Sequence, residues 1–339
     1  MSISGLGPHG ERAAPADKII LSEAEGAAAR KRRFVVAVVL HTTTSDWSKQ
    51  ELAGIVTMLG RFGAAVVEVI DCGFDVDAQN EALRRLATQR LDAVISIPIG
   101  NAKVADTHRA LAATGTKVVL LDNSPTGLVP GTDYVSIVSG DNFGLGQMAA
   151  ELLSPWVQRD GQIGILSYAA DFFATHEREI AFRKWIGDRR PDISIVRGKF
   201  REPNHAAEVA NALLDEHPAL AGLFAVWDVP ANIAAGELRA RGARLAITTV
   251  DLGNEAAVDL ANNGLIKGIA AQQPYDQGLA AATITLQALL GKSIPPWIAL
   301  PGLAVSANNV VEAYQVVWHA PAPPAVAHLR QAAVRDQSR

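Results

Sequence analysis

The sequence is poor in features that would indicate its surroundings directly. It has one cysteine, Cys72, among 339 residues, so no disulfide can form within the chain. No apolar run approaches the roughly 20 residues that a membrane-spanning helix needs. The 31 Lys and Arg against 35 Asp and Glu give a net charge of −4, which indicates no basic face for nucleic acid.

Motifs of catalysis and nucleotide binding are also scarce. The stretch HEREI (176–180) lacks the second histidine of a zinc helix, and the chain has no nucleophile elbow or phosphate-binding loop. The stretch GLGQMA (144–149) fits a dinucleotide fingerprint, but the next apolar run offers no acid for a ribose. His108, His205 and His217 lie at polar helix positions, where we expect them to be solvated. The sequence therefore predicts no enzyme, no cofactor and no bound metal.

What the chain does contain, from Phe34 onward, is a regular alternation of short apolar runs with longer segments of helical spacing. Continuous apolarity is typical of strands that are covered on both faces, as in parallel sheets with helical crossovers. The runs are 34–40, 64–70, 93–98, 117–122, 134–139, 162–167, 193–200, 222–228, 245–251 and 265–271. They favour an α/β fold of two doubly wound parallel-sheet lobes, and a (β/α)₈ barrel is the rival fold.

The N-terminal region has two interpretations. A basic stretch before residues 34–40 resembles the start of a signal peptide, but the apolar part is short and no small-residue cleavage pattern follows it. A first strand at 34–40 is the better interpretation, and it leaves export unproven. We expect residues 1–33 to be a polar, disordered leader.

Three apolar runs end in an acid: Asp122, Asp228 and Asp251. In an open parallel sheet, ligands bind outside the carboxyl ends of the strands, where such a carboxylate could accept hydrogen bonds from adjacent hydroxyl groups. An acid after a strand can equally cap the next helix. Pro230 favours the cap for Asp228, the turn after Asp122 favours a pocket, and spacing leaves both roles open for Asp251.

Two tryptophans add to this pattern. Trp47 opens the helix after the first run, and Trp227 ends its own run beside Asp228. Apolar sugar faces pack on aromatic rings while the hydroxyl edges need polar partners. A tryptophan in an α/β protein is more often part of the core, but two of them near acids at strand ends favour a carbohydrate site.

With these features, the chain resembles the ribose- and galactose-type sugar-binding proteins of ABC importers, which share their fold with the effector domains of lac-repressor-type regulators. The resemblance covers residues 34–318 and rests on VVLLDNSP, VSGDNFGLGQMAAELL, THEREIAFRKW, HPALAGLFAVWDVPANIAAGELRARG, TTVDLGNEAAVDLANNGLIKGIAAQQPYDQG and LQALLGKSIP. It implies a type I periplasmic binding protein with a three-crossing hinge. The implied N-terminal lobe is 34–136 plus 273–301, the C-terminal lobe is 137–272 plus 302–320, and 321–339 is a tail.

The resemblance also implies a set of ligand-binding residues. His176 stands where relatives often carry an arginine, Arg201 or its neighbour Phe200 falls near a stacking position, and Trp227 stands where asparagine is usual. Trp227 makes the site bulkier than a ribose site, which favours an acyclic polyol over a pyranose. The implied residues are Ser45, Trp47, Asp122, Asn123, His176, Arg201, Trp227, Asp251 and Gln272.

The function that follows is the capture of a small neutral sugar or polyol by hinge closure, for an ABC permease and its ATPase. We expect a monomer, located in the periplasm or at the cell surface, that binds no nucleic acid. The alternative is a cytoplasmic sugar-sensing regulator. It would lack a DNA-binding headpiece, because the 33 residues before the first strand do not form two helices joined by a turn.

Overall fold

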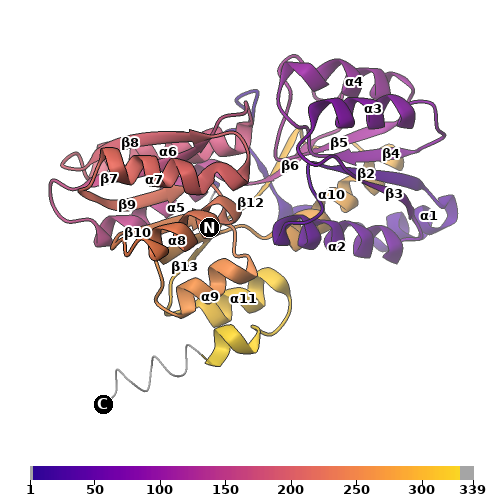
Figure 1. The fold of residues 1–339 in the computed structure, drawn as a ribbon. Coiled ribbons are helices and arrows are strands. Elements are labelled where there is room, and N and C mark those ends of the chain that lie inside the picture. The colour runs from indigo at the N-terminus through magenta and orange to yellow at the C-terminus, as the bar shows by residue number, and fades with distance from the viewer. Residues whose placement is uncertain (1–2, 329–339) are drawn as a thin grey trace. The chain divides into compact units, whose positions relative to one another are not determined.

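The computed structural model describes residues 3–328, and residues 1–2 and 329–339 lie outside this range. The described chain forms two compact units (Figure 1). Lobe 1 contains residues 3–140, 171–174 and 274–300, and lobe 2 contains residues 141–170, 175–273 and 301–328. The chain passes between them after Gly140, Gln273 and Leu300, and the short segment 171–174 returns to lobe 1. The crossings expected from the sequence lay after residues 136, 272 and 301.

The sheet of lobe 1 has the order β1-β12-β6-β5-β4-β2-β3, with every pair of neighbours parallel. Its strands are β1 (Ala14–Pro15), β2 (Val35–Leu40), β3 (Ala65–Asp71), β4 (Ala93–Ser96), β5 (Lys117–Leu121), β6 (Ile137–Gly140) and β12 (Trp297–Leu300). Its helices are α1 (Glu23–Arg32), α2 (Asp46–Arg61), α3 (Val76–Leu86), α4 (Ala102–Ala113) and α10 (Pro274–Leu289).

Helices cover both faces of this sheet (Figure 1). In β2, Val36 and Val38 join the core under α2 and α10, whereas Ala37 and Val39 join the core under α3 and α4. Successive side chains of a strand point to opposite faces, so a strand covered on both sides must be apolar throughout. This burial explains the unbroken apolar run in the sequence.

Helices α2 and α10 cross at a pair of glycines. A Cβ atom on Gly54 would lie 2.1 Å from the carbonyl oxygen of Tyr275, and one on Gly278 would lie 2.2 Å from that of Glu51. No side chain fits at such distances, so glycine is required at both positions for the two backbones to approach. The close crossing holds Glu51 of α2 beside the first turns of α10.

The sheet of lobe 2 has the order β13-β11-β10-β9-β7-β8, in which only β13 is antiparallel among the described strands. Its strands are β7 (Gln162–Tyr168), β8 (Ser194–Phe200), β9 (Leu220–Ala225), β10 (Ala246–Val250), β11 (Ile266–Ala271) and β13 (Leu303–Val305). Its helices are α5 (Asn142–Leu153), α6 (Phe173–Arg189), α7 (Ala206–Glu216), α8 (Asp228–Ala240), α9 (Asn254–Ala261) and α11 (Val310–Trp318). A glycine again permits a close approach, because a Cβ on Gly146 of α5 would lie 2.1 Å from the Arg178 carbonyl oxygen of α6.

The two sheets share one topology. The orders β6-β5-β4-β2-β3 and β11-β10-β9-β7-β8 correspond strand by strand. In each sheet the chain places its second strand of this series (β3 or β8) on one side of the first (β2 or β7) and then continues on the other side with β4 or β9. The switch points therefore lie between β2 and β4 in lobe 1 and between β7 and β9 in lobe 2. In open α/β sheets, ligands bind outside the carboxyl ends of the strands at such points.

The predicted fold class is confirmed, and the barrel alternative is wrong. All ten apolar runs contain a strand, from β2 to β11, but three strands were not expected. Strands β1, β12 and β13 are two to four residues long, too short for a periodicity argument. The run 222–228 ends as a strand at Ala225, so Trp227 is the residue before α8 and Asp228 is its first residue, not its cap.

The expectation of a disordered leader is wrong for the residues the structure describes. Helix α1 begins with a capping box between Ser22 and Glu25, and Lys292 forms an ion pair with Glu25 at 3.0 Å. Ala29 is fully buried in the core of lobe 1. The composition of residues 1–33 suggested disorder because their apolar contacts come from residues far away in the sequence.

His108 differs from the solvated side chain that we expected. It is fully buried on α4, with Nε2 3.0 Å from the Ser96 hydroxyl and Nδ1 2.7 Å from the Val104 carbonyl oxygen. Burial lowers its pKa to about 4.

Within the described part of the chain, no helix is both long and apolar enough to cross a membrane.

Candidate functional site

Lobe 1 places an aspartate directly after β5. Asp122 is buried, and its φ of 51° lies in the left-handed region, which is costly for a side chain other than glycine. The side-chain amide of Gln277, in the first turns of α10, donates to Asp122 Oδ2 at 3.1 Å and to the Val138 carbonyl oxygen at 3.2 Å. These bonds orient the carboxylate at the carboxyl edge of the sheet.

Helix α2 brings two further side chains to this edge. The Ser45 hydroxyl caps the helix by accepting from the Ser48 amide at 3.1 Å, so it serves the backbone. Trp47 is 8% exposed, and its ring lies 5.8 Å from the ring of His41, which follows β2. One turn later, the carboxyl group of Glu51 is fully buried.

The predicted site residue Asn123 serves the protein's own loops. Its amide nitrogen donates to the carbonyl oxygens of Pro98 at 2.9 Å and Gly100 at 2.8 Å. Its oxygen accepts from the Phe173 amide at 3.0 Å. The side chain thereby ties the loop after β4 to the returning segment 171–174, which leaves it little capacity for a ligand.

Lobe 2 repeats the aspartate at the end of β10. Asp251 is buried with a φ of 76°, and the amide of Gln272 donates to its Oδ1 at 2.7 Å. Burial raises the pKa of Asp251, while the charge of Arg178 and the bond from Gln272 oppose that rise. The resemblance pointed to both Asp251 and Gln272, and the structure brings them together.

The cation beside Asp251 is Arg178, not His176. Arg178 is buried, and its Nε donates to Asn142 Oδ1 at 2.8 Å and its Nη1 to the Val226 carbonyl oxygen at 2.9 Å. His176, two residues earlier on α6, is exposed. The sequence motif places both residues on the same helix turn, and the packing of α6 decides which one turns inward.

Three aromatic rings meet beside the switch point of lobe 2. Trp227 lies edge-on to Tyr168 and to Phe200, with ring centroids 5.2 Å apart in both pairs. Tyr168 and Phe200 are the last residues of β7 and β8. Such a cluster offers an apolar wall, and the partly buried Tyr168 and Trp227 keep a polar atom each for hydrogen bonding.

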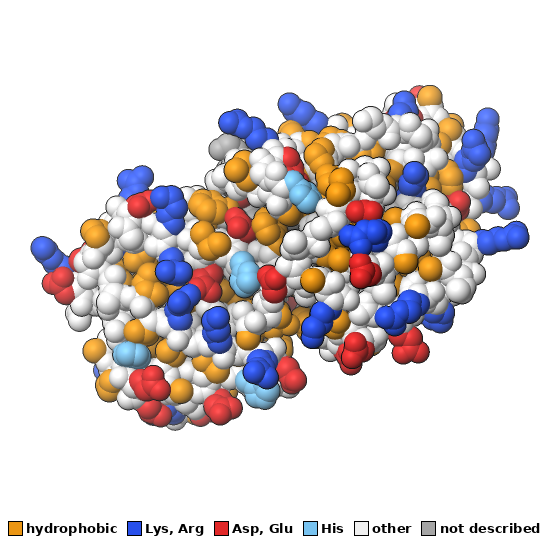
Figure 2. Space-filling model, turned by 90° about the horizontal axis from the view of Figure 1, so that it is seen from above, with side chains coloured by type: hydrophobic (Ala, Val, Ile, Leu, Met, Phe, Trp, Pro, Cys, Tyr) orange, Lys and Arg blue, Asp and Glu red, His pale blue; other side chains and the backbone are white. Residues whose placement is uncertain are grey.

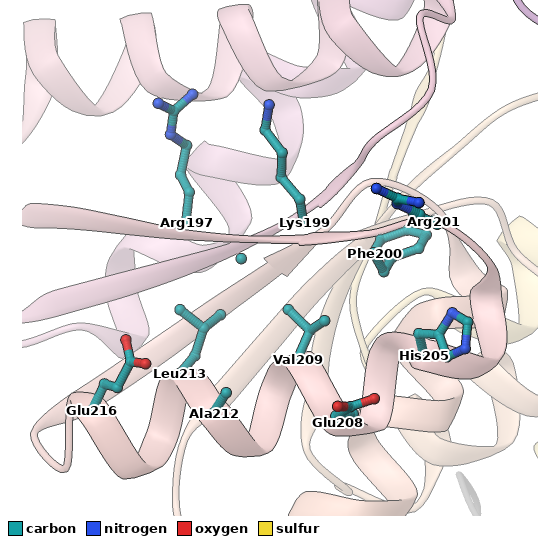
Figure 3. Close-up of a pocket in the computed structure, with 11 residues that line it drawn as sticks. Arg197, Lys199, Phe200, Arg201, His205, Glu208, Val209, Ala212, Leu213 and Glu216 are labelled. Atoms are coloured by element: carbon teal, nitrogen blue, oxygen red, sulfur yellow. The ribbon is translucent and has the colours of Figure 1, made fainter.

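Arg201 lies outside this cluster. It is exposed beyond the end of β8 and borders a groove of about 480 Å³ between β8 and α7 (Figure 3). Figure 3 shows Arg197 and Lys199 pointing from β8 away from Val209 and Leu213 of α7. Oppositely charged and aliphatic side chains line the groove, so we place the candidate site at the strand ends instead.

Comparison with protein families gives one match. A model described as the periplasmic binding protein domain matches residues 36–293, about three quarters of the chain. The chain belongs to the periplasmic binding protein domain family. No curated protein matches it in sequence.

Solved structures of periplasmic binding proteins share the fold. An ABC transporter solute-binding protein from Agrobacterium vitis, bound with α-D-tagatopyranose, is 21% identical at a TM-score of 0.77, covering 87% of this chain and 98% of that one. A second one from A. vitis, with bound allitol, is 19% identical at a TM-score of 0.75, covering 83% and 98%. One from Mycobacterium smegmatis, with bound glycerol, is 22% identical at 0.75, covering 84% and 96%.

Several residues at the strand ends of this periplasmic binding protein were missed from the sequence. They are His41, Glu51, Tyr168, Arg178 and Gln277. A signal existed for Tyr168, which directly follows the apolar run 162–167, much as Trp227 lies near the end of the run 222–228. The other four stand on helices or in a loop, where spacing along the chain does not show which side chain faces the sheet edge.

The charges of this binding protein form no field of one sign on the face drawn in Figure 2, where acidic and basic side chains alternate. Among the residues the structure describes, no group of three or more His, Cys, Asp or Glu side chains could hold a metal ion.

Proposed function

We propose that this periplasmic binding protein is the solute-binding component of an ABC importer and captures a small neutral sugar or polyol. The main observation that supports this proposal is the pair of buried aspartates, each of which accepts a hydrogen bond from a glutamine amide at the end of a parallel strand. A carboxylate held in this way can accept from two adjacent hydroxyl groups of one ligand. Relatives of the same fold hold a sugar, allitol or glycerol, which agrees with this chemistry.

The roles of the two lobes are complementary in this proposal. Asp122 and Trp47 are the ligand-binding residues of lobe 1 in this proposal, and Asp251, Arg178 and Trp227 are those of lobe 2. The aromatic cluster of lobe 2 packs on the apolar face of the carbon chain or ring, and the polar groups bind its hydroxyl edge. A substitution at any of these residues is therefore expected to weaken the complex.

The partners and location follow from the same proposal. The liganded protein delivers its cargo to an ABC permease that is driven by an ATPase, and it works as a monomer in the periplasm or at the cell surface. Alternation of charge on the face in Figure 2 supports a partner other than nucleic acid.

A thermal-shift panel of neutral sugars, polyols, acidic sugars and amino acids tests the function. A ligand at 100 times its Kd stabilises the folded state by about 2.7 kcal/mol, which is a shift of several degrees. We expect a neutral sugar or polyol to stabilise the wild type and the control Asp188→Ala, whose aspartate is an exposed partner of Lys184. Asp251→Ala should fold but show no shift. Stabilisation by acidic sugars or amino acids alone would contradict the proposal.

A further inference from the structure

Lobe 1 buries polar atoms that the described chain does not pair. Trp47 Nε1, both carboxyl oxygens of Glu51, Gln277 Oε1 and His41 Nδ1 are buried without a hydrogen-bond partner among the described residues. In folded proteins about 90% or more of buried polar groups have such a partner. Several exceptions in one small region require a physical explanation.

These atoms belong to one cluster at the carboxyl edge of the sheet. Trp47 and Glu51 are four residues apart on α2 and so lie on one face of the helix. The His41 ring lies 5.8 Å from the Trp47 ring, and Gln277 donates to Asp122 at 3.1 Å. Asp122 also acts on Glu51 electrostatically, which places the two acids near one another.

The bonds already made define what Gln277 can still do. Its amide nitrogen is used by Asp122 and by the Val138 carbonyl oxygen, so the side-chain orientation is determined. The remaining group is its carbonyl oxygen, which can only accept. A binding partner for Gln277 must therefore carry a donor.

Glu51 offers the complementary group. It is fully buried, and both burial and the neighbouring charge of Asp122 raise its pKa well above the usual range. Both effects favour the uncharged form, and a protonated carboxyl group has one O–H donor and one acceptor oxygen. A hydroxyl group can accept from this O–H while it donates to Gln277. A carboxylate or phosphate would instead meet Asp122 and the Gln277 acceptor, and like charge disfavours it.

We propose that Glu51 is a ligand-binding residue of lobe 1, whose carboxyl group and the Gln277 carbonyl oxygen, both buried without a partner among the described residues, together bind one hydroxyl group of the sugar or polyol. The inference rests on the proposed function and adds an acid that lies one helix turn beyond Trp47. It makes the site select for a hydroxyl at one position of the ligand, since an analogue without it leaves two buried polar groups unpaired.

Calorimetric titration with the best ligand of the panel and its series of single deoxy analogues tests the inference. We expect Glu51→Leu to bind the parent about 10- to 100-fold more weakly, and Glu51→Gln, whose amide has both a donor and an acceptor, to remain within about fivefold. One deoxy analogue should bind the wild type weakly and lose nothing further in Glu51→Leu. The control is Glu81→Leu, which removes an exposed acid from α3 of the same lobe.

Folding of the variants is a separate readout. Leucine has the size and helix propensity for α2, and it removes a buried carboxyl group without partners, so the melting temperature of ligand-free Glu51→Leu should not fall. Equal weakening of the parent and every deoxy analogue, or unchanged binding of the parent, would overturn the role of Glu51 while the proposed function stands. If no neutral sugar or polyol binds the wild type, the proposed function fails and the inference fails with it.

Discussion

Asp122 and Asp251 are equivalent residues of two separate lobes. They directly follow β5 and β10, which occupy matching places in the two sheet orders. Both have a left-handed backbone, with φ of 51° and 76°, and each accepts from a glutamine side chain, at 3.1 Å and 2.7 Å. A strained conformation that recurs at the same topological position is costly twice, which supports the proposal that both aspartates bind the ligand.

The buried guanidinium of Arg178 leads to the first prediction. Arg178→Met removes its bonds to Asn142 and Val226 and leaves Asp251 without its neighbouring cation. We expect a loss of about 3 kcal/mol in the free energy of unfolding, measured by urea denaturation. The matched control is Arg183→Met on the exposed side of the same helix, with a change within about 0.5 kcal/mol. Equal stability of the two variants would show that Arg178 is not part of a buried polar cluster.

The second prediction concerns acid stability and His108. Its pKa of about 4 in the folded protein lies below its ordinary value of about 6.5, so the unfolded chain takes up the proton first. Above about pH 6.5, neutral His108 contributes its full stabilisation of the folded state. This contribution decreases as the pH falls toward 4, and at pH 5 the loss is about 2 kcal/mol.

Urea denaturation at pH 7 and pH 5 checks this value. The free energy of unfolding should change between pH 7 and pH 5 by about 2 kcal/mol less in His108→Gln than in the wild type, because glutamine does not titrate. His41, whose pKa burial also lowers to about 4, is present in both proteins and cancels in the comparison. An identical pH dependence of wild type and His108→Gln would refute the burial of a neutral imidazole.

The third prediction tests the glycine crossing of α2 and α10. In Gly278→Ala the new methyl group would lie 2.2 Å from the Glu51 carbonyl oxygen, so the helices must separate. We expect a destabilisation of about 2 kcal/mol or more, with weaker ligand binding because Gln277 moves. Gly60→Ala, on α2 where no atom lies within 4 Å of the added Cβ, should instead stabilise by about 0.5–1 kcal/mol. Thermal unfolding of both variants, with and without ligand, decides between them.

The fourth prediction concerns residues 1–33. Removing them exposes core side chains that α1 covers, so lobe 1 should lose about 2 kcal/mol or more and become sensitive to protease. A milder variant is Gly26→Val, since a Cβ at this position would lie 2.5 Å from the Phe62 ring and displace α1. Proteolysis sites mapped by mass spectrometry should fall in lobe 1 and not in lobe 2. Resistance of the shortened chain equal to that of the full chain would mean that the segment contributes nothing to lobe 1.

The sequence by itself determined the two-lobed α/β fold and half of the candidate site. A strand that is covered on both faces must be apolar throughout, so ten strands could be recognised from their apolar runs alone. Parallel strands end at one edge, so the position of Asp122, Trp227 and Asp251 at the ends of such runs is enough to assign them to that edge.

Only the tertiary structure decided how the helices are turned, and with them the rest of the site. His176 and Arg178 are equally plausible in the sequence, but the close approach of α5 to α6 at Gly146 turns Arg178 inward. By its charge Glu51 would be assigned to the solvent face of α2, yet the glycine crossing with α10 buries it. Ser45 and Asn123 have the right chemistry for a ligand, but a helix end and two loops use their hydrogen bonds. Which face of a helix turns toward the sheet edge, and which groups a polar side chain bonds, depend on residues far away in the chain. The burial of a strand and the edge at which it ends depend instead on the local sequence pattern.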